Sequence, residues 1–539
     1  MYNISLKTAY FPAQTDAEIH DITIGNLLRK IAAKYPDAIA VQEIDNSGLN
    51  ARAYTYAELL TQSEQLALAL SSRFQLGEKI VVWAPNQPEW ILMEYACALA
   101  GLVLVTANPS FQAKELRYVL EQSGAVALFY VAEFRGNPMA GIAGEALARN
   151  EHIREQVLLT DQAAMLHQAN PDQAATLPMV CPQDAAQIQY TSGTTGFPKG
   201  ATLSHRNLHN NARLFADRVG VNQQSVWANF MPLFHTAGCA TGTLGCLQAG
   251  CRMLLIRQFN ADSLAELIER EGVTTFFAVP TMLVALLESL AKTPRDMTSM
   301  HSITSGGAPV APDLVRHVKA QLGCHFQSAF GQTESSPMIS LNHPDVSLDE
   351  ICTSAGQPLP QCEVSIRSPE DNSALGIGEV GEICTRSYAV MLGYHANEAA
   401  TQAAIDTEGW LHTGDWGKLD EKGFIRVTGR LKDMIIRGGE NRFPAEIEYV
   451  LITHDSVAEV AVVGLPDEKW GEIIAAFVRT ENNQPLDDQA LHAHCREYLS
   501  AQKTPTDWVQ VESFPLTGSG KMQKFVLRER YLAREYGEI

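Results

Sequence analysis

The 539-residue sequence lacks the short motifs that would place it in several common classes of protein. Its ten cysteines include no CxxC pair, which argues against a zinc knuckle or a dithiol redox motif and favours reduced, mostly buried thiols. It also has no run rich in lysine and arginine, and 61 acidic against 41 basic residues give a formal charge of −20. A nucleic-acid partner or an anionic membrane surface is therefore not expected, and any phosphate ligand must be held locally.

Signals for export or membrane insertion are also missing. The first residues, MYNISLKTAYFPAQ, do not have the basic stretch and apolar run of a signal peptide. The most membrane-like window, from Ile91 to Ala107, contains Glu94 and Gly101 and has about the minimum length for a span. We expect a core helix that leads into a strand at this window, and a cytoplasmic protein without integral membrane association.

The sequence does contain the material for a large, buried core. Hydrophobic residues make up 46% of the chain and charged residues 19%, and the length predicts about three or four folding units. Short apolar runs such as KIVVW, VALFY and RMLLI alternate with stretches of helical length such as ADSLAELIEREG. This alternation is typical of an α/β fold in which βα units surround largely parallel sheets.

The pattern changes after about residue 360. Polar loops with glycine and proline now separate strands such as EVGEICTR and FIRVTG, which predicts a β-rich subdomain over about 360–431. An amphipathic helix (PAEIEYVLITH) and two strands (VAEVAVVG and IIAAFVR) follow, which predicts a small α+β domain. The predicted organisation is an N-terminal domain over 1–431 and a C-terminal domain over 432–539.

The segment from Tyr190 to Gly200, YTSGTTGFPKG, is the most informative part of the sequence. It follows a predicted strand and combines three glycines with several hydroxyl groups and Lys199. Glycine permits unusual backbone angles, hydroxyls donate hydrogen bonds and the lysine supplies positive charge, so the segment can cradle a polyphosphate. It is not a Walker A loop, because Pro198 precedes Lys199 and Gly200 follows it. A flexible surface loop is the alternative, but it does not explain the hydroxyls and the lysine.

This segment resembles the signature phosphate loop of the adenylate-forming (AMP-binding) superfamily, which includes acyl- and aryl-CoA synthetases, luciferases and nonribosomal adenylation domains. Further blocks occur in the order of that family: PLFHTAG, SGGAP, FGQTE, GEICTR, WLHTGDWG, GRLKDMIIRGGEN and PLTGSGK. The resemblance covers nearly the whole chain and is strongest to the acyl-CoA synthetase, or fatty-acid–CoA ligase, branch. It implies an AMP-forming acid–thiol ligase that uses ATP, Mg²⁺ and coenzyme A, with a mobile C-terminal domain.

The resemblance also implies which residues bind the nucleotide and coenzyme A. Phe330 would stack on adenine, Thr333 would contact the α-phosphate, and Glu334 would bind Mg²⁺, a cation that prefers carboxylate and phosphate oxygens. Asp415 and Arg430 would bind the ribose, whereas outside this pattern such a pair is more often a surface ion pair. The other implied positions are Thr191, Ser192, Gly193, Thr194, Thr195, Gly196, Lys199, Gly307, Ala308, Pro309, Gly331, Gln332, Gly438 and Gly439.

Catalytic positions follow from the same resemblance. Lys521 would be the lysine that the C-terminal domain brings to the acyl carboxylate and the α-phosphate, and Lys432 would be the hinge. Thr333, Glu334 and His235 complete the implied catalytic set. His235 would lie beside the acyl tunnel, although a core histidine bonded to the backbone is an alternative.

Two features bear on the acid. No aspartate near His235 is available for the ammonium group of an amino acid, which argues against an amino acid substrate. Gly331 stands where acetyl-CoA synthetases carry a tryptophan, so we expect room for a longer chain or a ring.

The expected reaction joins a carboxylic acid to ATP, releases pyrophosphate, and then transfers the acyl group from acyl-AMP to coenzyme A. A medium- or longer-chain fatty acid is favoured. The alternatives are an aryl-CoA ligase, an acyl-AMP ligase that loads a carrier protein, and, more distantly, a catalytically silent nucleotide- or acyl-binding protein. The expected partners are small molecules, and the chain is expected to be a monomer or a homodimer.

Overall fold

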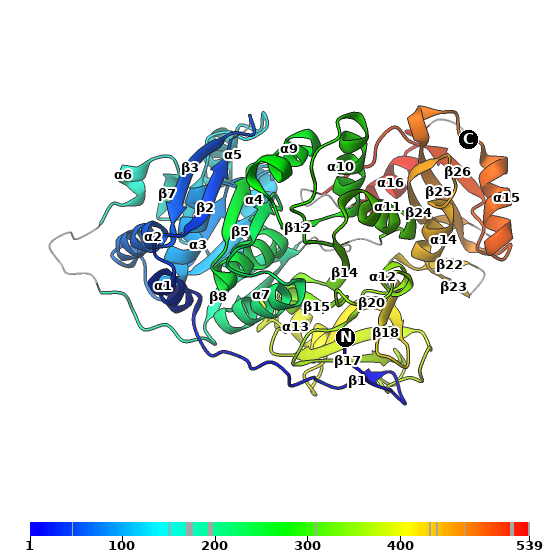
Figure 1. The fold of residues 1–539 in the computed structure, drawn as a ribbon, viewed down its shortest axis with the longest axis horizontal. Helices are drawn as coiled ribbons and strands as arrows, with labels where there is room; N and C mark the ends of the chain where they lie inside the picture. Colours follow the sequence, from blue (N-terminus) through cyan, green and yellow to red (C-terminus); the bar gives the residue numbers. More distant parts are fainter. Residues whose placement is uncertain are drawn as a thin grey trace.

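The computed structural model describes residues 1–45, 47–148, 150, 152–168, 176–191, 198–307, 310–430, 433–437, 440–467, 469–517 and 522–536. Within these residues the strands form four sheets, which Figure 1 shows in sequence colours. Two large sheets lie in the first part of the chain, an antiparallel sheet follows, and a small sheet belongs to the C-terminal part.

The first large sheet has the phosphate-loop strands near one edge. Its strand order is β19 (Gly393–Tyr394), β9 (Lys199–Ser204), β8 (Ala185–Thr191), β5 (Val103–Ala107), β4 (Lys79–Trp83), β6 (Ala127–Tyr130) and β7 (Glu155–Leu158). From β8 to β7 all neighbours are parallel, whereas β8–β9 and β9–β19 are antiparallel. Apolar runs such as KIVVW fit these positions, because the inner strands of a parallel sheet are covered on both faces.

The membrane-like window of the sequence is a buried helix followed by an inner strand, as predicted. Helix α3 (Pro88–Ala100) buries every residue except Glu89, and it ends at Gly101, whose φ of 65° is the left-handed conformation that glycine tolerates best. β5 follows directly. In the part of the chain that the structure describes, no helix is both long enough and apolar enough to cross a bilayer.

The second large sheet carries the other nucleotide-binding blocks. Its strand order is β16 (Gln357–Pro358), β15 (Met338–Leu341), β14 (His325–Gly331), β13 (Ser302–Gly306), β12 (Thr275–Ala278), β10 (Val226–Asn229), β11 (Arg252–Ile256), β2 (Ile39–Ile44) and β3 (Asn50–Thr55). The strands from β14 to β2 are parallel. The SGGAP and FGQTE blocks therefore begin at the carboxyl ends of two adjacent parallel strands, β13 and β14, where α/β sheets commonly bind ligands.

Helices accompany these sheets along the chain as far as residue 404. The capping box of Thr55 and Glu58 begins α2, because each side chain accepts a hydrogen bond from the backbone of the other residue. The helices are α1 (Ile24–Lys34), α2 (Tyr56–Ser71), α3, α4 (Ala113–Ser123), α5 (Met139–Leu147), α6 (Gln162–Met165), α7 (His205–Val219), α8 (Gly245–Ala249), α9 (Ala261–Glu271), α10 (Pro280–Lys292), α11 (Pro312–Leu322), α12 (Leu348–Thr353) and α13 (Glu398–Ala404).

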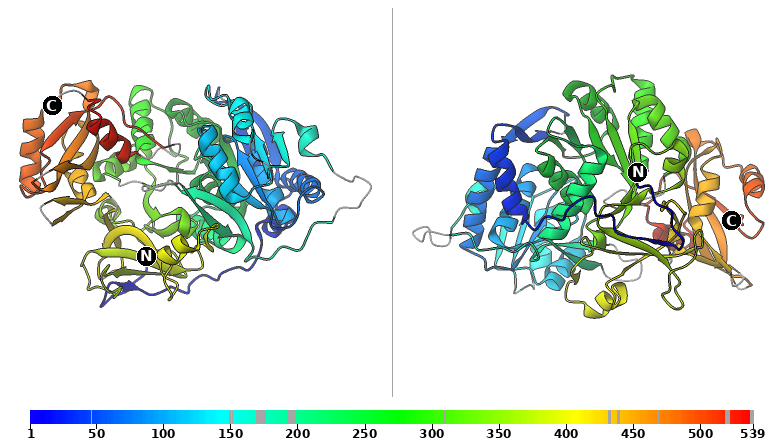
Figure 2. Two further views of the ribbon diagram at one scale, coloured as in Figure 1. Left: turned by 180° about the vertical axis from the view of Figure 1, so that it is seen from behind. Right: turned by 60° about the horizontal axis from the view of Figure 1, so that its bottom comes forward.

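The predicted β-rich subdomain is an antiparallel sheet that also takes a strand from the far N-terminus. Its order is β1 (Tyr10–Phe11), β17 (Cys362–Arg367), β18 (Gly381–Ser387), β20 (Leu411–Leu419) and β21 (Ile425–Arg430). Tyr10 pairs with Ser365, and Figures 1 and 2 show the dark-blue N-terminal segment running along this sheet. The sequence did not predict β1, because two residues carry no readable alternation.

The C-terminal part is a separate α+β unit, as predicted. Its sheet has β22 (Ile435–Arg437) between β23 (Glu440–Arg442) and β25 (Gly471–Thr480), and β24 (Val457–Asp467) and β26 (Asp507–Gln510) also pair with β25. Helices α14 (Pro444–Leu451), α15 (Asp488–Tyr498) and α16 (Lys524–Leu532) accompany it, at the end of the molecule away from α1 and α2 in Figure 1. All ten cysteines of the chain are free and nine are buried, which agrees with the predicted reduced thiols.

Candidate active site

The two ends of the predicted phosphate loop lie opposite each other on paired strands. β8 ends at Thr191 and β9 begins at Lys199, and these two residues are direct partners in the antiparallel ladder. The Thr191 hydroxyl also donates a 3.3 Å hydrogen bond to the carbonyl oxygen of Lys199. The structure therefore places the two ends of the segment side by side on paired strands, and Ser192, Gly193, Thr194, Thr195 and Gly196 lie outside the described residues.

A buried carboxylate lies near the ends of these two strands. The Tyr394 hydroxyl donates a 2.7 Å hydrogen bond to Oε1 of Glu334, and Nζ of Lys199 lies 4.8 Å from the centre of the Tyr394 ring. Burial, and then the neighbouring Glu334, raises the pKa of Tyr394, so its hydroxyl stays a donor at neutral pH. The structure brings Lys199 and Glu334 together through Tyr394, which the sequence did not identify as a site residue.

The donor set around Glu334 fits a magnesium ion bound together with phosphates. Glu334 is 8% exposed, and the neighbouring Thr333, also buried, offers a hydroxyl in the same 3-10 turn over Thr333–Ser335. Carboxylate and hydroxyl oxygens are hard ligands, and Mg²⁺ commonly takes one or two carboxylates and completes its shell with phosphate oxygens and water. Glu334 is therefore a suitable candidate for the predicted metal ligand.

The residues before this turn are shaped by close backbone contacts. A Cβ atom on Gly331 would lie 2.0 Å from the carbonyl oxygen of Pro337, and the same carbonyl accepts a 2.9 Å hydrogen bond from the backbone N–H of Gln332. The close backbone contact thus requires glycine at position 331. The small size of Gly331 therefore does not by itself show that the acyl pocket is large. Phe330, predicted to stack on adenine, is 8% exposed and belongs to an apolar cluster that includes Ile339.

The SGGAP block, residues 305–309, is described only in part. A Cβ atom on Gly306 would lie 2.8 Å from the carbonyl oxygen of Ala329, and Gly307 has a φ of 81°. The glycines therefore allow β13 to approach β14 closely and the chain to turn at its end. The predicted residues Ala308 and Pro309 lie outside the described part of the chain.

Asp415 and Arg430 form the predicted pair. They are direct partners between β20 and β21, and Nε of Arg430 donates a 3.0 Å hydrogen bond to Oδ1 of Asp415. The Asp415 side chain is 6% exposed, whereas the Arg430 side chain is 50% exposed. The carboxylate is thus held from one side by a guanidinium that itself reaches solvent.

His235 lies in a tight turn that begins a buried π-helix. Its backbone N–H donates to the carbonyl oxygen of Pro232 (3.0 Å), and its ring Nδ1 accepts from the backbone N–H of Ala237 (3.2 Å). A neutral ring with Nδ1 as acceptor carries its proton on Nε2. All eight residues of the π-helix, Ala237–Leu244, are buried, and π-helical turns frequently occur at functional sites. This π-helix was not predicted from the sequence.

The four predicted residues of the C-terminal part lie outside the described structure: Lys432, Gly438, Gly439 and Lys521. The residues that flank Lys521 are described. Leu516 and Met522 form an antiparallel bridge, and the backbone N–H of Gln523 donates to the carbonyl oxygen of Pro515 (2.8 Å). Residues 515–516 and 522–523, on either side of the undescribed residues 518–521, are therefore paired with each other.

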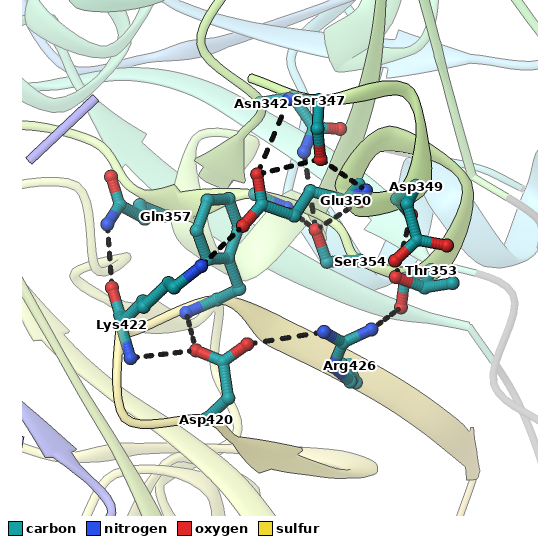
Figure 3. A network of polar contacts seen from close by, with 12 residues as sticks. Asn342, Ser347, Asp349, Glu350, Thr353, Ser354, Gln357, Asp420, Lys422 and Arg426 are labelled. Atoms are coloured by element: carbon teal, nitrogen blue, oxygen red, sulfur yellow. Dashed lines mark hydrogen bonds and ion pairs between the residues drawn. The ribbon is translucent and has the colours of Figure 1, made fainter.

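A surface hollow of about 500 Å³ lies away from these residues, at the β20–β21 turn. In Figure 3 four of its charged side chains form two ion pairs: Nζ of Lys422 lies 3.3 Å from Oε1 of Glu350, and Nη2 of Arg426 lies 3.3 Å from Oδ2 of Asp420. Arg426 also donates to the carbonyl oxygen of Thr353 at 3.1 Å. None of the predicted site residues is among the residues that line this hollow, and its paired charges favour a structural role.

Comparison with known proteins identifies the family. A family model described as AMP-binding enzyme matches residues 28–395, and one described as AMP-binding enzyme C-terminal domain matches residues 446–521. YngI of Bacillus subtilis is 35% identical over 95% of this chain and 98% of its own length. The human mitochondrial protein ACSF2, named a medium-chain acyl-CoA ligase, is 32% identical over 97% of this chain and 89% of its own.

A solved structure agrees with this comparison. O-succinylbenzoate coenzyme A synthetase (MenE) from Bacillus subtilis, in complex with ATP and magnesium ion, has a TM-score of 0.80 and 30% sequence identity, and the match covers 95% of this chain and 99% of that chain. The chain belongs to the AMP-binding enzyme family. The predicted family, the α/β fold class with a C-terminal domain, and the prediction of an AMP-forming ligase are confirmed.

Proposed function

We propose that this enzyme is an acyl-CoA synthetase for fatty acids of medium or longer chain. The observation that carries the proposal is the convergence of Lys199, Tyr394 and Glu334 at the paired ends of β8 and β9. A cation, a neutral donor and a buried carboxylate from three distant segments meet there, as binding of a magnesium–phosphate group requires. The preference for medium chains is supported by the printed name of ACSF2.

The predicted co-substrates ATP, Mg²⁺ and coenzyme A agree with the relatives, among which are a synthetase in complex with ATP and magnesium ion and a coenzyme A ligase. When bound, Mg²⁺ would neutralise phosphate charge, with Glu334 as its protein ligand. We propose that Thr191, Lys199 and the loop between them hold the phosphates, that Thr333 contacts the α-phosphate, and that Asp415 and Arg430 bind the ribose.

The reaction has two halves. In the first, a carboxylate oxygen of the acid attacks the α-phosphorus, the bond to pyrophosphate breaks, and acyl-AMP forms. In the second, the thiol of coenzyme A loses its proton and attacks the acyl carbonyl, and AMP leaves. The chain's own residues act mainly by orienting these groups and offsetting their negative charge, with Lys521 as the mobile cation of the first half.

We further propose that the chain divides at Lys432 into domains 1–431 and 432–539, with Lys432 as the hinge. The apolar clusters of the described residues support this division. The cluster that contains Ile435 and the cluster that contains Leu465 and Phe477 consist only of residues after the proposed hinge. The other clusters draw only on residues before it. Separate cores allow one domain to turn against the other while the packing inside each core is kept.

A second candidate is an aryl-CoA ligase. It is favoured by the similarity to MenE, whose named substrate, O-succinylbenzoate, contains a benzene ring. His235 and the π-helix after it are compatible with either acid. A cytoplasmic location and a monomeric or homodimeric state remain predictions from the sequence.

One substrate panel tests these proposals. The enzyme is incubated with ATP, Mg²⁺ and coenzyme A and, in parallel, with acetate, octanoate, palmitate or benzoate, and acyl-CoA and pyrophosphate are both quantified. We expect the highest kcat/KM for octanoate or palmitate. A highest value for benzoate would favour the aryl-CoA ligase, and pyrophosphate release without any thioester would favour an enzyme that loads a carrier protein.

A further inference from the structure

Asp415 lies in a bulge of its strand. Between β18 and β20, Cys384 pairs with His412 and Glu382 pairs with Trp416. Three residues of β20, including Asp415, therefore stand opposite Ile383 alone. Such bulges often lie beside active sites, where they re-aim a side chain. The direction of the Asp415 carboxylate thus depends on the groups that hold the bulge.

Side chains of β18 and of the bulge itself hold this backbone. Oε1 of Glu382 accepts a 2.9 Å hydrogen bond from the backbone N–H of Gly414, whose φ is 70°. The Thr413 hydroxyl donates to the carbonyl oxygen of Ile383 (2.6 Å) and accepts from the backbone N–H of Asp415 (3.1 Å). Of these two side chains, Glu382 contacts the bulge from the neighbouring strand β18, whereas Thr413 belongs to the bulge itself.

Glu382 is in turn fixed by a histidine. Nδ1 of His412 lies 2.8 Å from Oε2 of Glu382, and Nε2 of the same ring lies 3.5 Å from Oδ2 of Asp406. The Asp406 carboxylate also accepts hydrogen bonds from the backbone N–H groups of Glu408 and Trp410, both at 2.9 Å. The hydrogen bond to Glu382 is the largest cause of the raised pKa of His412, and Asp406 adds to it. A protonated ring can donate to both carboxylates at once.

The same residues could be a metal site, since Glu382, Cys384 and His412 offer ligand atoms within 4.8 Å of one another. Two observations favour hydrogen bonding. Each ring nitrogen of His412 already faces a carboxylate oxygen, at 2.8 and 3.5 Å. Burial also raises the pKa of the Cys384 thiol, so Cys384 stays a neutral group, and a thiol binds metals well only as the thiolate.

We propose that Glu382, His412 and Asp406 form a clamp that positions Asp415 for the ribose of ATP. The clamp runs from the 406–410 turn through the His412 ring to the Glu382 carboxylate, and from there to the backbone N–H next to Asp415. His412 and Glu382 are positioning residues, because they act through Asp415. This inference rests on the role proposed above for Asp415.

The experiment compares kcat/KM for ATP with that for its 2′-deoxy and 3′-deoxy analogues, and this ratio is the preference for the ribose hydroxyls. Pyrophosphate release with octanoate is the readout. The variants are Glu382→Ala, His412→Ala, Glu382→Gln and Asp415→Ala. We expect KM for ATP to rise about tenfold in the first two variants, the effect of one lost hydrogen bond to a charged group, with a much smaller change in kcat. Their preference for the ribose hydroxyls should fall toward that of Asp415→Ala. Glu382→Gln should keep part of it, because its amide oxygen can still accept from Gly414.

Thr385→Val is the matched control, since Thr385 lies on the same strand and its hydroxyl donates to the carbonyl oxygen of Glu363 (2.9 Å) and to no clamp residue among those described, and it should keep the full preference. The clamp would be overturned if Glu382→Ala and His412→Ala kept the full preference while Asp415→Ala lost it. That result would leave the proposed function intact. Full preference in Asp415→Ala would overturn the ribose assignment and the clamp with it. A stoichiometric metal in the purified enzyme that is lost in Cys384→Ala would also overturn the clamp.

Discussion

The Tyr394 hydroxyl donates a 2.7 Å hydrogen bond to the Glu334 carboxylate, although the two residues are 60 positions apart in the chain. Tyr394 reaches this position because β19 pairs with β9, with Tyr394 opposite Ala201. The pairing also brings the ring within 4.8 Å of the Lys199 ammonium. One tyrosine thus joins the base of the phosphate loop to the proposed magnesium ligand.

Replacement of Tyr394 by phenylalanine should weaken the use of magnesium. The variant keeps the ring and its contact with Lys199 but removes the donor that orients Glu334. Loss of a group that orients a metal ligand typically costs about 10–100-fold in metal affinity, so we expect about a tenfold rise in the Mg²⁺ concentration that gives half-maximal pyrophosphate release.

Tyr190→Phe is the control for this variant, because Tyr190 lies in the same pair of strands, opposite Gly200, but its hydroxyl contacts Gln122 and not Glu334. Its Mg²⁺ requirement should match that of the parent enzyme. An unchanged Mg²⁺ requirement in Tyr394→Phe would contradict the role of this hydrogen bond.

Gly331→Ala should damage the fold and not only narrow the acyl pocket. The new Cβ atom would lie 2.0 Å from the Pro337 carbonyl oxygen, so backbone must move. Overpacking of this kind commonly lowers the free energy of unfolding by about 1–3 kcal/mol. We expect a lower Tm and a loss of activity that is similar for acetate, octanoate and palmitate.

Gly141→Ala serves as the control substitution, since Gly141 lies within α5 and no atom would come within 4 Å of its Cβ. Alanine in a helix is favourable, so its Tm should not fall. If Gly331→Ala kept its Tm and lost activity only with octanoate and palmitate, this account would be wrong. The residue at position 331 would then set the size of the acyl pocket.

A buried carboxyl group makes the stability of this enzyme depend on pH. Glu94 of α3 is 2% exposed, and its Oε1 accepts a 2.8 Å hydrogen bond from Gln187 on β8, while Oε2 has no hydrogen-bond partner among the described residues. Burial raises the pKa of Glu94 from 4.5 to about 8. Between these values the folded chain holds a proton that the unfolded chain has lost, so stability is fully present below pH 4.5 and falls as the pH rises toward 8.

Glu94→Gln should remove this dependence. The amide can still accept from Gln187 and has no charge to bury, so at pH 7 the variant avoids a linkage cost of about 3 kcal/mol. Thermal unfolding between pH 5 and pH 8 should therefore show a higher Tm and a flatter profile for Glu94→Gln, with the largest gain near pH 8. Glu121→Gln on the exposed face of α4 should leave the profile as it is, and an equally steep profile in Glu94→Gln would contradict this account.

The sequence predicted the parts of the site that depend on local order. The strand before the phosphate loop and the β-rich region after residue 360 follow from residues near one another in the chain, whereas Asp415 and Arg430 were named from the family resemblance. Tyr394 and Glu382 could not be predicted, because each acts on a residue brought close by strand pairing across a long separation. Strand β1 was also missed, because its two residues carry no readable alternation and only the pairing with β17 defines it.

Removal of the Lys521 ammonium should separate the two halves of the reaction. In the first half a carboxylate must approach a phosphorus surrounded by negative oxygens. An ammonium about 4 Å away contributes about 4 kcal/mol at an effective dielectric constant near 20, which corresponds to roughly a thousandfold in rate. Lys521→Ala should therefore lose about that factor in pyrophosphate release from ATP and octanoate, and keep thioester formation from supplied octanoyl-AMP and coenzyme A.

The control for this variant is Lys524→Ala, three residues further along the chain, because the Lys524 ammonium pairs with Oε1 of Glu448 at 2.5 Å within the C-terminal part. A general loss of positive charge would affect both lysine variants alike, whereas a mobile catalytic cation predicts that only Lys521→Ala fails in the first half. Equal losses in both half-reactions for Lys521→Ala would show that the lysine supports the fold or coenzyme A binding, and its proposed role would have to be given up.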